Sequence, residues 1–150
     1  MTFANRLVEQ GGEKMRKFVL VSHGSLAQGV KNSVEMISGK QDNLYAFCMQ
    51  EGESPAILKE KISNFLEQNK KGEIVFVSDF PGGSVNTMLM NFLDCDNVFL
   101  VSGMNSMLVL NLLLSQAKID VCLDKAIEAG KATIKRIEIV EEDQEDDFFD

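Results

Sequence analysis

Apolar and polar positions follow two alternating rhythms along the chain, and together they predict an α/β fold. Short runs that are continuously apolar and rich in β-branched or aromatic side chains are typical of buried strands. Between them, apolar residues recur every three or four positions, as on a helix with one buried face. The predicted strands cover residues 17–22, 43–49, 73–78 and 97–102, and the predicted helices cover 26–38, 55–70, 85–93, 106–117 and 122–129.

A further strand is expected after the last helix. Residues 133–140 alternate partly between polar and apolar side chains, which suits a half-exposed edge strand. The regular order of strand and helix predicts a doubly wound, mainly parallel sheet with helices on both faces. Residues 17–140 are therefore expected to form one domain.

The two ends of the chain lie outside this pattern. Residues 1–16 are polar and weakly periodic, and we expect an N-terminal extension without regular structure; Met15 is an alternative native start. Residues 141–150 form an acidic tail containing Phe148-Phe149. We expect this tail to be disordered, and solubility is a more ordinary role for it than docking.

Charge and cysteine content narrow the function. The chain of 150 residues has a formal net charge of −8, which argues against binding nucleic acid or an anionic membrane surface. Its three cysteines form no CxxC pair, and one histidine cannot complete a standard zinc site with them. With an odd cysteine count, no apolar run of about 18 residues and no signal-peptide pattern, a cytoplasmic protein is expected.

Polar residues follow three of the predicted strands: His23, Asp79 and Asn105. The carboxyl ends of parallel strands meet at one edge of the sheet, so these side chains can converge. A carboxylate that accepts a hydrogen bond from one imidazole nitrogen fixes the tautomer and leaves the other nitrogen free as a nucleophile. Asp79 is the natural partner of His23.

Two glycine-containing turns, Gly82-Gly83-Ser84 and Gly24-Ser25, each precede a predicted helix. Backbone amides at a helix start favour anions, and glycine lets a phosphate approach closely. The Walker, dinucleotide-binding and Gly-x-Ser-x-Gly patterns are absent. A nucleophilic nitrogen beside anion-binding turns suits phosphoryl transfer through a phosphohistidine.

Each of these residues also has an ordinary structural interpretation. A histidine at a strand end is often a structural or surface residue. The Gly-Gly-Ser turn can be only a turn with Ser84 as helix cap, Asp79 a turn residue and Asn105 a cap.

Three motifs in order give the chain a specific resemblance: Ser22-His23-Gly24, Asp79-Phe80-Pro81-Gly82-Gly83-Ser84 and Gly103-Met104-Asn105-Ser106-Met107-Leu108. Over residues 17–140 it resembles the enzyme IIA component of the mannose-family bacterial sugar phosphotransferase system. This resemblance implies a phosphocarrier without metal or organic cofactor. By this resemblance the chain would accept a phosphoryl group from HPr and pass it to a IIB component, so its link to the membrane would be indirect.

The resemblance also implies roles for individual residues. His23 would be phosphorylated on Nε2, and Asp79 would orient the ring through Nδ1. Ser84 and nearby turn residues would contact the phosphoryl group. The full set of implied phosphoryl contacts is Gly24, Ser25, Gly83 and Ser84, with Asn105 as possible support.

The family fold places an antiparallel edge strand, often exchanged in a homodimer, where residues 133–140 lie. Many members have Gly-Gly-Ser-Pro-x-Asn, whereas this chain has Val85 after Ser84 and Asn86 one residue earlier. Two alternatives stay open. One is a regulatory module in which phosphorylation signals sugar supply to a protein partner, and the other is a small-molecule-binding domain with an incidental histidine.

Overall fold

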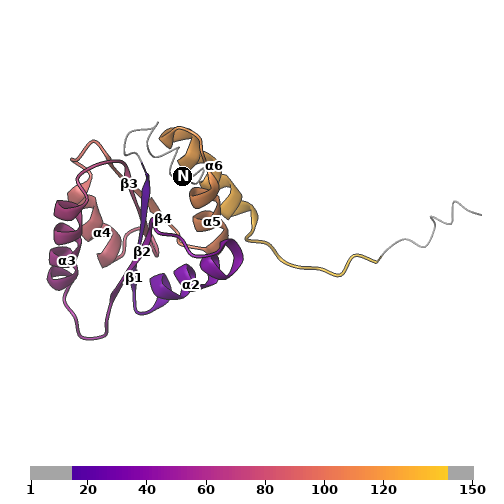
Figure 1. The fold of residues 1–150 in the computed structure, drawn as a ribbon. Coiled ribbons are helices and arrows are strands. Elements are labelled where there is room, and N and C mark those ends of the chain that lie inside the picture. The colour runs from indigo at the N-terminus through magenta and orange to yellow at the C-terminus, as the bar shows by residue number, and fades with distance from the viewer. Residues whose placement is uncertain (1–14, 142–150) are drawn as a thin grey trace, which may run out of the picture.

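The computed structural model describes residues 15–141, which form a sheet covered by helices on both faces (Figure 1). The predicted N-terminal extension (1–16) and acidic tail (141–150) therefore lie almost entirely outside the described residues. No helix within residues 15–141 combines the length and apolar character that crossing a membrane requires.

Strands and helices alternate along the chain, as the hydrophobic pattern predicts. The strands are β1 (Lys17–His23), β2 (Leu44–Met49), β3 (Ile74–Ser78) and β4 (Val98–Ser102). The helices are α2 (Leu26–Ser38), α3 (Pro55–Gln68), α4 (Ser84–Leu89), α5 (Ser106–Leu114) and α6 (Ile119–Ala132), with a 3-10 turn, η1 (Met90–Phe92), continuing α4.

The sheet has the order β2-β1-β3-β4, and every neighbouring pair of strands is parallel. From β1 the chain first moves outward to β2 and then returns to the other side of β1 to form β3. β1 and β3 are thus neighbours at the point where the strand order reverses. In open α/β sheets, ligands bind outside the carboxyl ends of the strands at this point.

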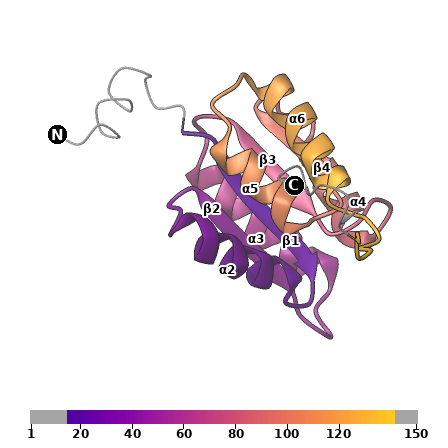
Figure 2. The ribbon, with the colours of Figure 1, turned by 90° about the vertical axis from the view of Figure 1, so that its right-hand side faces the viewer.

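Side chains of each central strand alternate between two hydrophobic cores. In β1, Phe18 and Leu20 pack in the core shared with α2, α5 and α6, whereas Val19 and Val21 pack in the core shared with α3 and α4. Figure 2 looks onto the face of the sheet that α2, α5 and α6 cover. Because helices cover both faces, successive residues are all buried. This burial explains the continuous apolar runs that marked the strands in the sequence.

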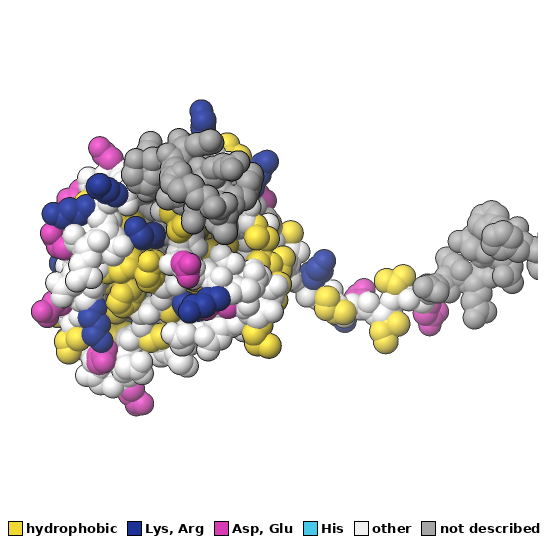
Figure 3. Space-filling view, in the orientation of Figure 1, with side chains coloured by type: hydrophobic (Ala, Val, Ile, Leu, Met, Phe, Trp, Pro, Cys, Tyr) yellow, Lys and Arg dark blue, Asp and Glu magenta, His cyan; other side chains and the backbone are white. Residues whose placement is uncertain are grey.

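The prediction of a C-terminal antiparallel edge strand at residues 133–140 is wrong. After α6 the described chain has no regular structure and runs away from the domain, with its apolar side chains exposed along it (Figures 1 and 3). Ile134, Ile137, Ile139 and Val140 are each at least 79% exposed. An alternating pattern marks a segment able to form a strand, but a strand also needs a neighbour to complete its hydrogen bonds. Within residues 15–141 no segment pairs with it, and the sheet is entirely parallel.

Candidate active site

His23 and Asp79 meet at the carboxyl edge of the sheet, as the strand ends predict. His23 is the last residue of β1, and Asp79 directly follows β3. The Asp79 Oδ2 atom lies 2.7 Å from His23 Nδ1 and also accepts the His23 backbone N–H at 2.9 Å. One carboxylate oxygen therefore holds both the main chain and the ring of His23.

Asp79 remains a carboxylate in this setting. Its side chain is only 6% exposed, and this burial alone would raise the pKa of Asp79. Hydrogen bonds from the His23 backbone, the His23 ring and the Phe80 backbone N–H (3.0 Å to Oδ1) outweigh burial and lower the pKa of Asp79. A charged acceptor beside Nδ1 favours the tautomer that carries its proton there.

Ser84 approaches the other nitrogen of the His23 ring. Its Oγ atom, at the start of α4, lies 2.9 Å from Nε2. With the proton on Nδ1, Nε2 is unprotonated and accepts the Ser84 hydroxyl. The His23 side chain is 38% exposed, so an incoming group can reach Nε2, the only nucleophilic ring nitrogen in this tautomer.

A polar cluster beneath the site fastens α4 to the sheet. The Ser78 Oγ atom lies 2.6 Å from Asn86 Oδ1 and 2.7 Å from Ser102 Oγ. Since the amide oxygen can only accept, Ser78 donates to Asn86 and accepts the hydroxyl of Ser102. Ser78 is fully buried and Asn86 nearly so. This cluster fixes the first turn of α4, and with it Ser84, relative to the end of β3.

Three further predicted contacts of the phosphoryl group are Gly83, Gly24 and Ser25. Gly83 is buried and precedes α4 with φ −74°, next to Ser84. Gly24 donates its backbone N–H to the Met49 carbonyl at 2.9 Å, so this amide is already engaged. Ser25 is exposed at the start of α2.

Asn105 serves as the cap of α5. Its Oδ1 accepts the Leu108 backbone N–H at 2.9 Å, and its Nδ2 donates to the Gly103 carbonyl at 3.2 Å. Both side-chain bonds stay within its own turn. The structure thus brings His23, Asp79 and Ser84 together, while Asn105 has the capping role that was its ordinary interpretation.

Sequence reasoning missed the structural roles of three serines, of which Ser78 and Ser102 end β3 and β4 and Ser22 is the last residue but one of β1. Ser22 accepts the Ala27 N–H at 2.8 Å and so satisfies the start of α2, while Ser78 and Ser102 belong to the polar cluster. The sequence does contain a pattern that marks these serines, because β1, β3 and β4 each contain a Val-Ser pair at the end of an apolar run. Phe80, which stacks on the His23 ring, was also missed.

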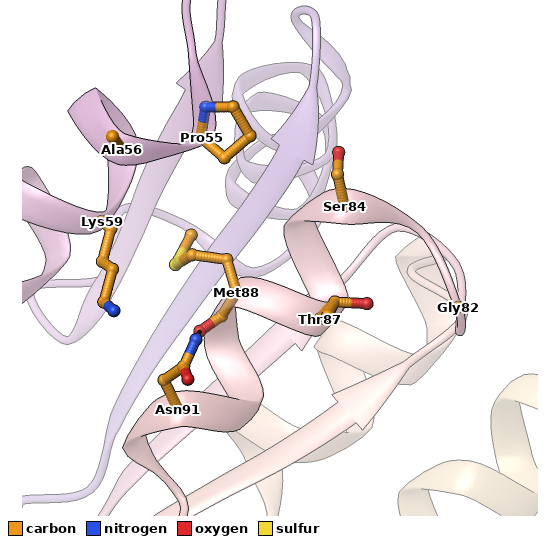
Figure 4. Close-up of a pocket in the computed structure, with 8 residues that line it drawn as sticks. All are labelled: Pro55, Ala56, Lys59, Gly82, Ser84, Thr87, Met88 and Asn91. Atoms are coloured by element: carbon orange, nitrogen blue, oxygen red, sulfur yellow. Dashed lines mark hydrogen bonds between the residues drawn. The ribbon is translucent and has the colours of Figure 1, made fainter.

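An open groove of about 550 Å³ lies beside the site between α3 and α4. Pro55, Ala56 and Lys59 line it from α3, and Met88 and Ser84 line it from α4 (Figure 4). Because Ser84 is also bonded to His23, the groove adjoins the nucleophilic nitrogen.

Comparison with known proteins agrees with this geometry. Residues 17–128 match the family model described as the fructose IIA component of the phosphotransferase system, of the mannose type. The chain belongs to this enzyme IIA family. The sheet edge with His23 and Asp79 lies wholly within the matched residues, whereas no curated protein matches the chain.

Solved structures show how widely the IIA fold is shared. A candidate phosphoenolpyruvate-dependent sugar phosphotransferase system permease from Klebsiella pneumoniae is 30% identical, with TM-score 0.74, and the match covers 81% of this chain and 90% of that one. The mannose/sorbose-specific IIA subunit from Enterococcus faecalis has TM-score 0.79 at 19% identity, covering 85% and 98%. A sigma-54 interaction domain protein from Enterococcus faecalis has TM-score 0.68 at 16% identity, covering 79% and 93%. The last two likenesses show the fold alone.

Proposed function

We propose that this IIA family member is a cytoplasmic phosphohistidine carrier. It accepts a phosphoryl group from phospho-HPr on Nε2 of His23 and passes it to a IIB component for sugar uptake. The observation that carries this proposal is the 2.7 Å contact between Nδ1 and Asp79, which favours the tautomer with its proton on Nδ1 and its lone pair on Nε2, in a side chain that is 38% exposed. No metal or organic cofactor takes part in the proposed reaction.

In the proposed transfer, the Nε2 lone pair forms a bond to phosphorus as the bond from phosphorus to the donor histidine breaks. The donor nitrogen keeps the electron pair of the broken bond. The proton on Nδ1 stays in its hydrogen bond to Asp79, so the phosphorylated His23 ring is cationic. The Asp79 carboxylate stabilises this charge, as an aspartate does for an imidazolium in acyl transfer. Transfer to the IIB nucleophile breaks the Nε2–phosphorus bond and returns the pair to Nε2.

Ser84 is the proposed first contact of the phosphoryl group. Its hydroxyl occupies the lone-pair direction of Nε2 in this structure and must turn away when phosphorus arrives. Turned by one rotamer, it can donate to a phosphoryl oxygen. Gly83 is a proposed contact through its main chain, because the space that a Cβ atom would take there is filled by the Phe80 ring. Ser25, exposed at the start of α2, is a second proposed contact, whereas the Gly24 amide is held by Met49.

A regulatory phospho-switch is the second candidate function. The fold likeness to the sigma-54 interaction domain protein favours it, since the same architecture occurs there in a protein named for a regulatory interaction. The chemistry at His23 would be the same. The fate of the phosphoryl group distinguishes the two functions. A carrier loses its phosphoryl group to IIB, whereas a switch keeps it and changes its affinity for a protein partner.

We also propose that the protein is a homodimer. Ile134, Ile137 and Ile139 extend away from the domain with their side chains in solvent. Burying one such side chain is worth about 1.5–3 kcal/mol. A second copy of the chain is the simplest source of a surface to cover them.

Phosphorylation through the general proteins of the system tests the carrier function. Purified protein incubated with phosphoenolpyruvate, enzyme I and HPr should acquire one phosphoryl group, and His23→Ala should acquire none. Asp79→Asn should be labelled about 10- to 100-fold more slowly, the effect of losing a hydrogen bond to a charged group. Labelling is followed by intact mass and the modified peptide is mapped.

The matched control is Asp124→Asn, which makes the same change at an exposed carboxylate on α6. It should be labelled at the wild-type rate. Labelling of His23→Ala equal to that of wild type would exclude His23 as the phosphoryl acceptor. Transfer of the label to IIB supports the carrier, and retention of the label in the presence of IIB supports the switch.

A further inference from the structure

Phe80 is a large apolar side chain that stays in solvent beside the site. It is 51% exposed, yet its ring is stacked on that of His23, with the ring centroids 5.5 Å apart and the planes inclined by 14°. Offset stacking of this kind is a favoured arrangement of aromatic rings. The imidazole is therefore held in plane by Asp79 at one nitrogen and covered on one face by Phe80.

The main chain of Phe80 contributes to the same arrangement. Its N–H donates to Asp79 Oδ1 at 3.0 Å, while Asp79 Oδ2 holds Nδ1 of His23. A single residue thus contacts both members of the His23–Asp79 pair, one through its backbone and the other through its ring.

Gly83 makes room for the Phe80 ring. The backbone of Gly83 has φ −74°, which any residue can adopt, so conformation does not require glycine here. Glycine is instead required by the lack of space, because a Cβ atom at this position would lie 2.6 Å from Phe80 Cε2 and 2.8 Å from Cζ. The ring is accordingly packed between Gly83 and His23, and a methyl group at residue 83 would drive it out.

We infer that Phe80, seated against Gly83, is a positioning residue that fixes the His23 ring so that Nε2 faces the incoming phosphorus. This inference rests on the proposed carrier function and adds a residue to it. Small misalignment of a nucleophile is costly for transfer rates. Losing the ring should therefore slow phosphoryl transfer while leaving the fold and the identity of the phosphorylated residue unchanged.

A double-mutant cycle tests this inference. Phe80→Ala and Gly83→Ala should each lower the rate of phosphorylation by phospho-HPr about 3- to 10-fold, the range expected for one aromatic pair. The double variant Phe80→Ala/Gly83→Ala should be no slower than Phe80→Ala, because a methyl group at residue 83 has no ring left to displace. Independent effects that multiply in the double variant overturn the inference, as do unchanged rates in both single variants. Met36→Ala, which removes a large side chain that is 88% exposed on α2, is the control and should transfer at the wild-type rate.

A spectroscopic measurement separates this inference from the carrier function. The chain has one histidine, so its two carbon-bound ring protons give an isolated pair of NMR signals. Both should show Overhauser contacts to the Phe80 ring, and both should change chemical shift in Phe80→Ala and in Gly83→Ala. If wild type shows these contacts but is not phosphorylated, the carrier function fails while the ring contact stands. Absence of the contacts overturns the role of Phe80 whatever the labelling result.

Discussion

The two nitrogens of the His23 ring have different surroundings, and this difference directs the proposed chemistry. Nδ1 lies 2.7 Å from a buried carboxylate, whereas Nε2 lies 2.9 Å from an exposed hydroxyl that can turn aside. The first contact fixes the proton on Nδ1, and the second frees the lone pair of Nε2 when the Ser84 hydroxyl turns away. A histidine with two equivalent environments would lack this preference.

The lowered pKa of Asp79 predicts an acid-dependent contribution to stability. An aspartate in an unfolded chain has a pKa of about 3.9. The contribution should be fully present above that pH and lost as the pH falls through the lower folded-state pKa of Asp79. Asp79→Asn should therefore be about 1–3 kcal/mol less stable than wild type at pH 7, with the difference shrinking below about pH 4. Urea unfolding across this pH range measures it.

Asp124→Asn again serves as the control, since its carboxylate is exposed on α6. Its unfolding free energy should follow that of wild type at every pH, within about 0.5 kcal/mol. A stability difference between Asp79→Asn and wild type that is the same at pH 7 and pH 3 would contradict the role assigned to the hydrogen bonds around Asp79.

The sequence was sufficient to predict that His23, Asp79 and Ser84 lie at one edge of the sheet; their roles remain a proposal. His23, Asp79 and Ser84 follow or precede recognisable elements, and parallel strands bring their carboxyl ends to one edge whatever the details of packing. Phe80 could not be placed in this way. Its stacking on His23 depends on the path of the turn and on the missing side chain of Gly83, which only the three-dimensional arrangement reveals.

Among the elements, α4 has the greatest influence on the site because it presents Ser84 to His23. This helix has only six residues, Ser84–Leu89, and is too short to be stable by itself. It is held by apolar packing of Val85, Met88 and Leu89, and by the bond between Asn86 and Ser78. Asn86 therefore supports the site from the first turn of α4, two residues after Ser84.

Removing the Asn86 side chain should weaken this support. Asn86→Ala leaves the buried Ser78 hydroxyl without its acceptor, so the unfolding free energy should fall by about 1–3 kcal/mol. Chemical denaturation measures this loss. Asn91→Ala is the matched change at an exposed asparagine on η1, whose amide donates to the Met88 carbonyl, and should cost less than about 1 kcal/mol. Equal losses in the two variants would show that the polar cluster does not fasten α4.

Hydrophobic periodicity predicted the strands and helices well where each element packs against other elements within residues 15–141. It failed at residues 133–140, where the alternating pattern is present but no strand within residues 15–141 lies beside it. Helix ends also differed from the prediction, and α6 begins at Ile119 rather than at residue 122. Its first turn packs beside α5, and the sequence there has no strong capping signal that would have marked this start. Local pattern thus describes what a segment can form, and its surroundings decide what it does form.

At the scale of the whole molecule, the sheet separates the functional edge from the rest of the surface. The order β2-β1-β3-β4 places His23 and Asp79 at the carboxyl ends of adjacent strands at the reversal point. The C-terminal segment leaves the domain after α6, with apolar side chains exposed. The proposed reaction and the proposed dimer therefore use different parts of the chain.

The dimer proposal predicts a specific effect of charge in the C-terminal segment. Ile137→Asp combined with Ile139→Asp should convert a dimer to a monomer, because burying either carboxylate in an apolar contact is unfavourable. Sedimentation equilibrium measures the change in mass. Met36→Asp, at an exposed apolar residue on α2, should leave the mass unchanged. A wild-type protein that sediments as a monomer at all concentrations would contradict the proposal.

The most direct test of the central claim is the position of the phosphoryl group on the single histidine. Protein labelled with ¹⁵N in its imidazole ring, phosphorylated through enzyme I and HPr, should show phosphorus coupling at Nε2 of His23. Nδ1 should keep its proton and its hydrogen bond to Asp79. Phosphorus on Nδ1, phosphorylation at another residue, or no phosphorylation at all would contradict the account.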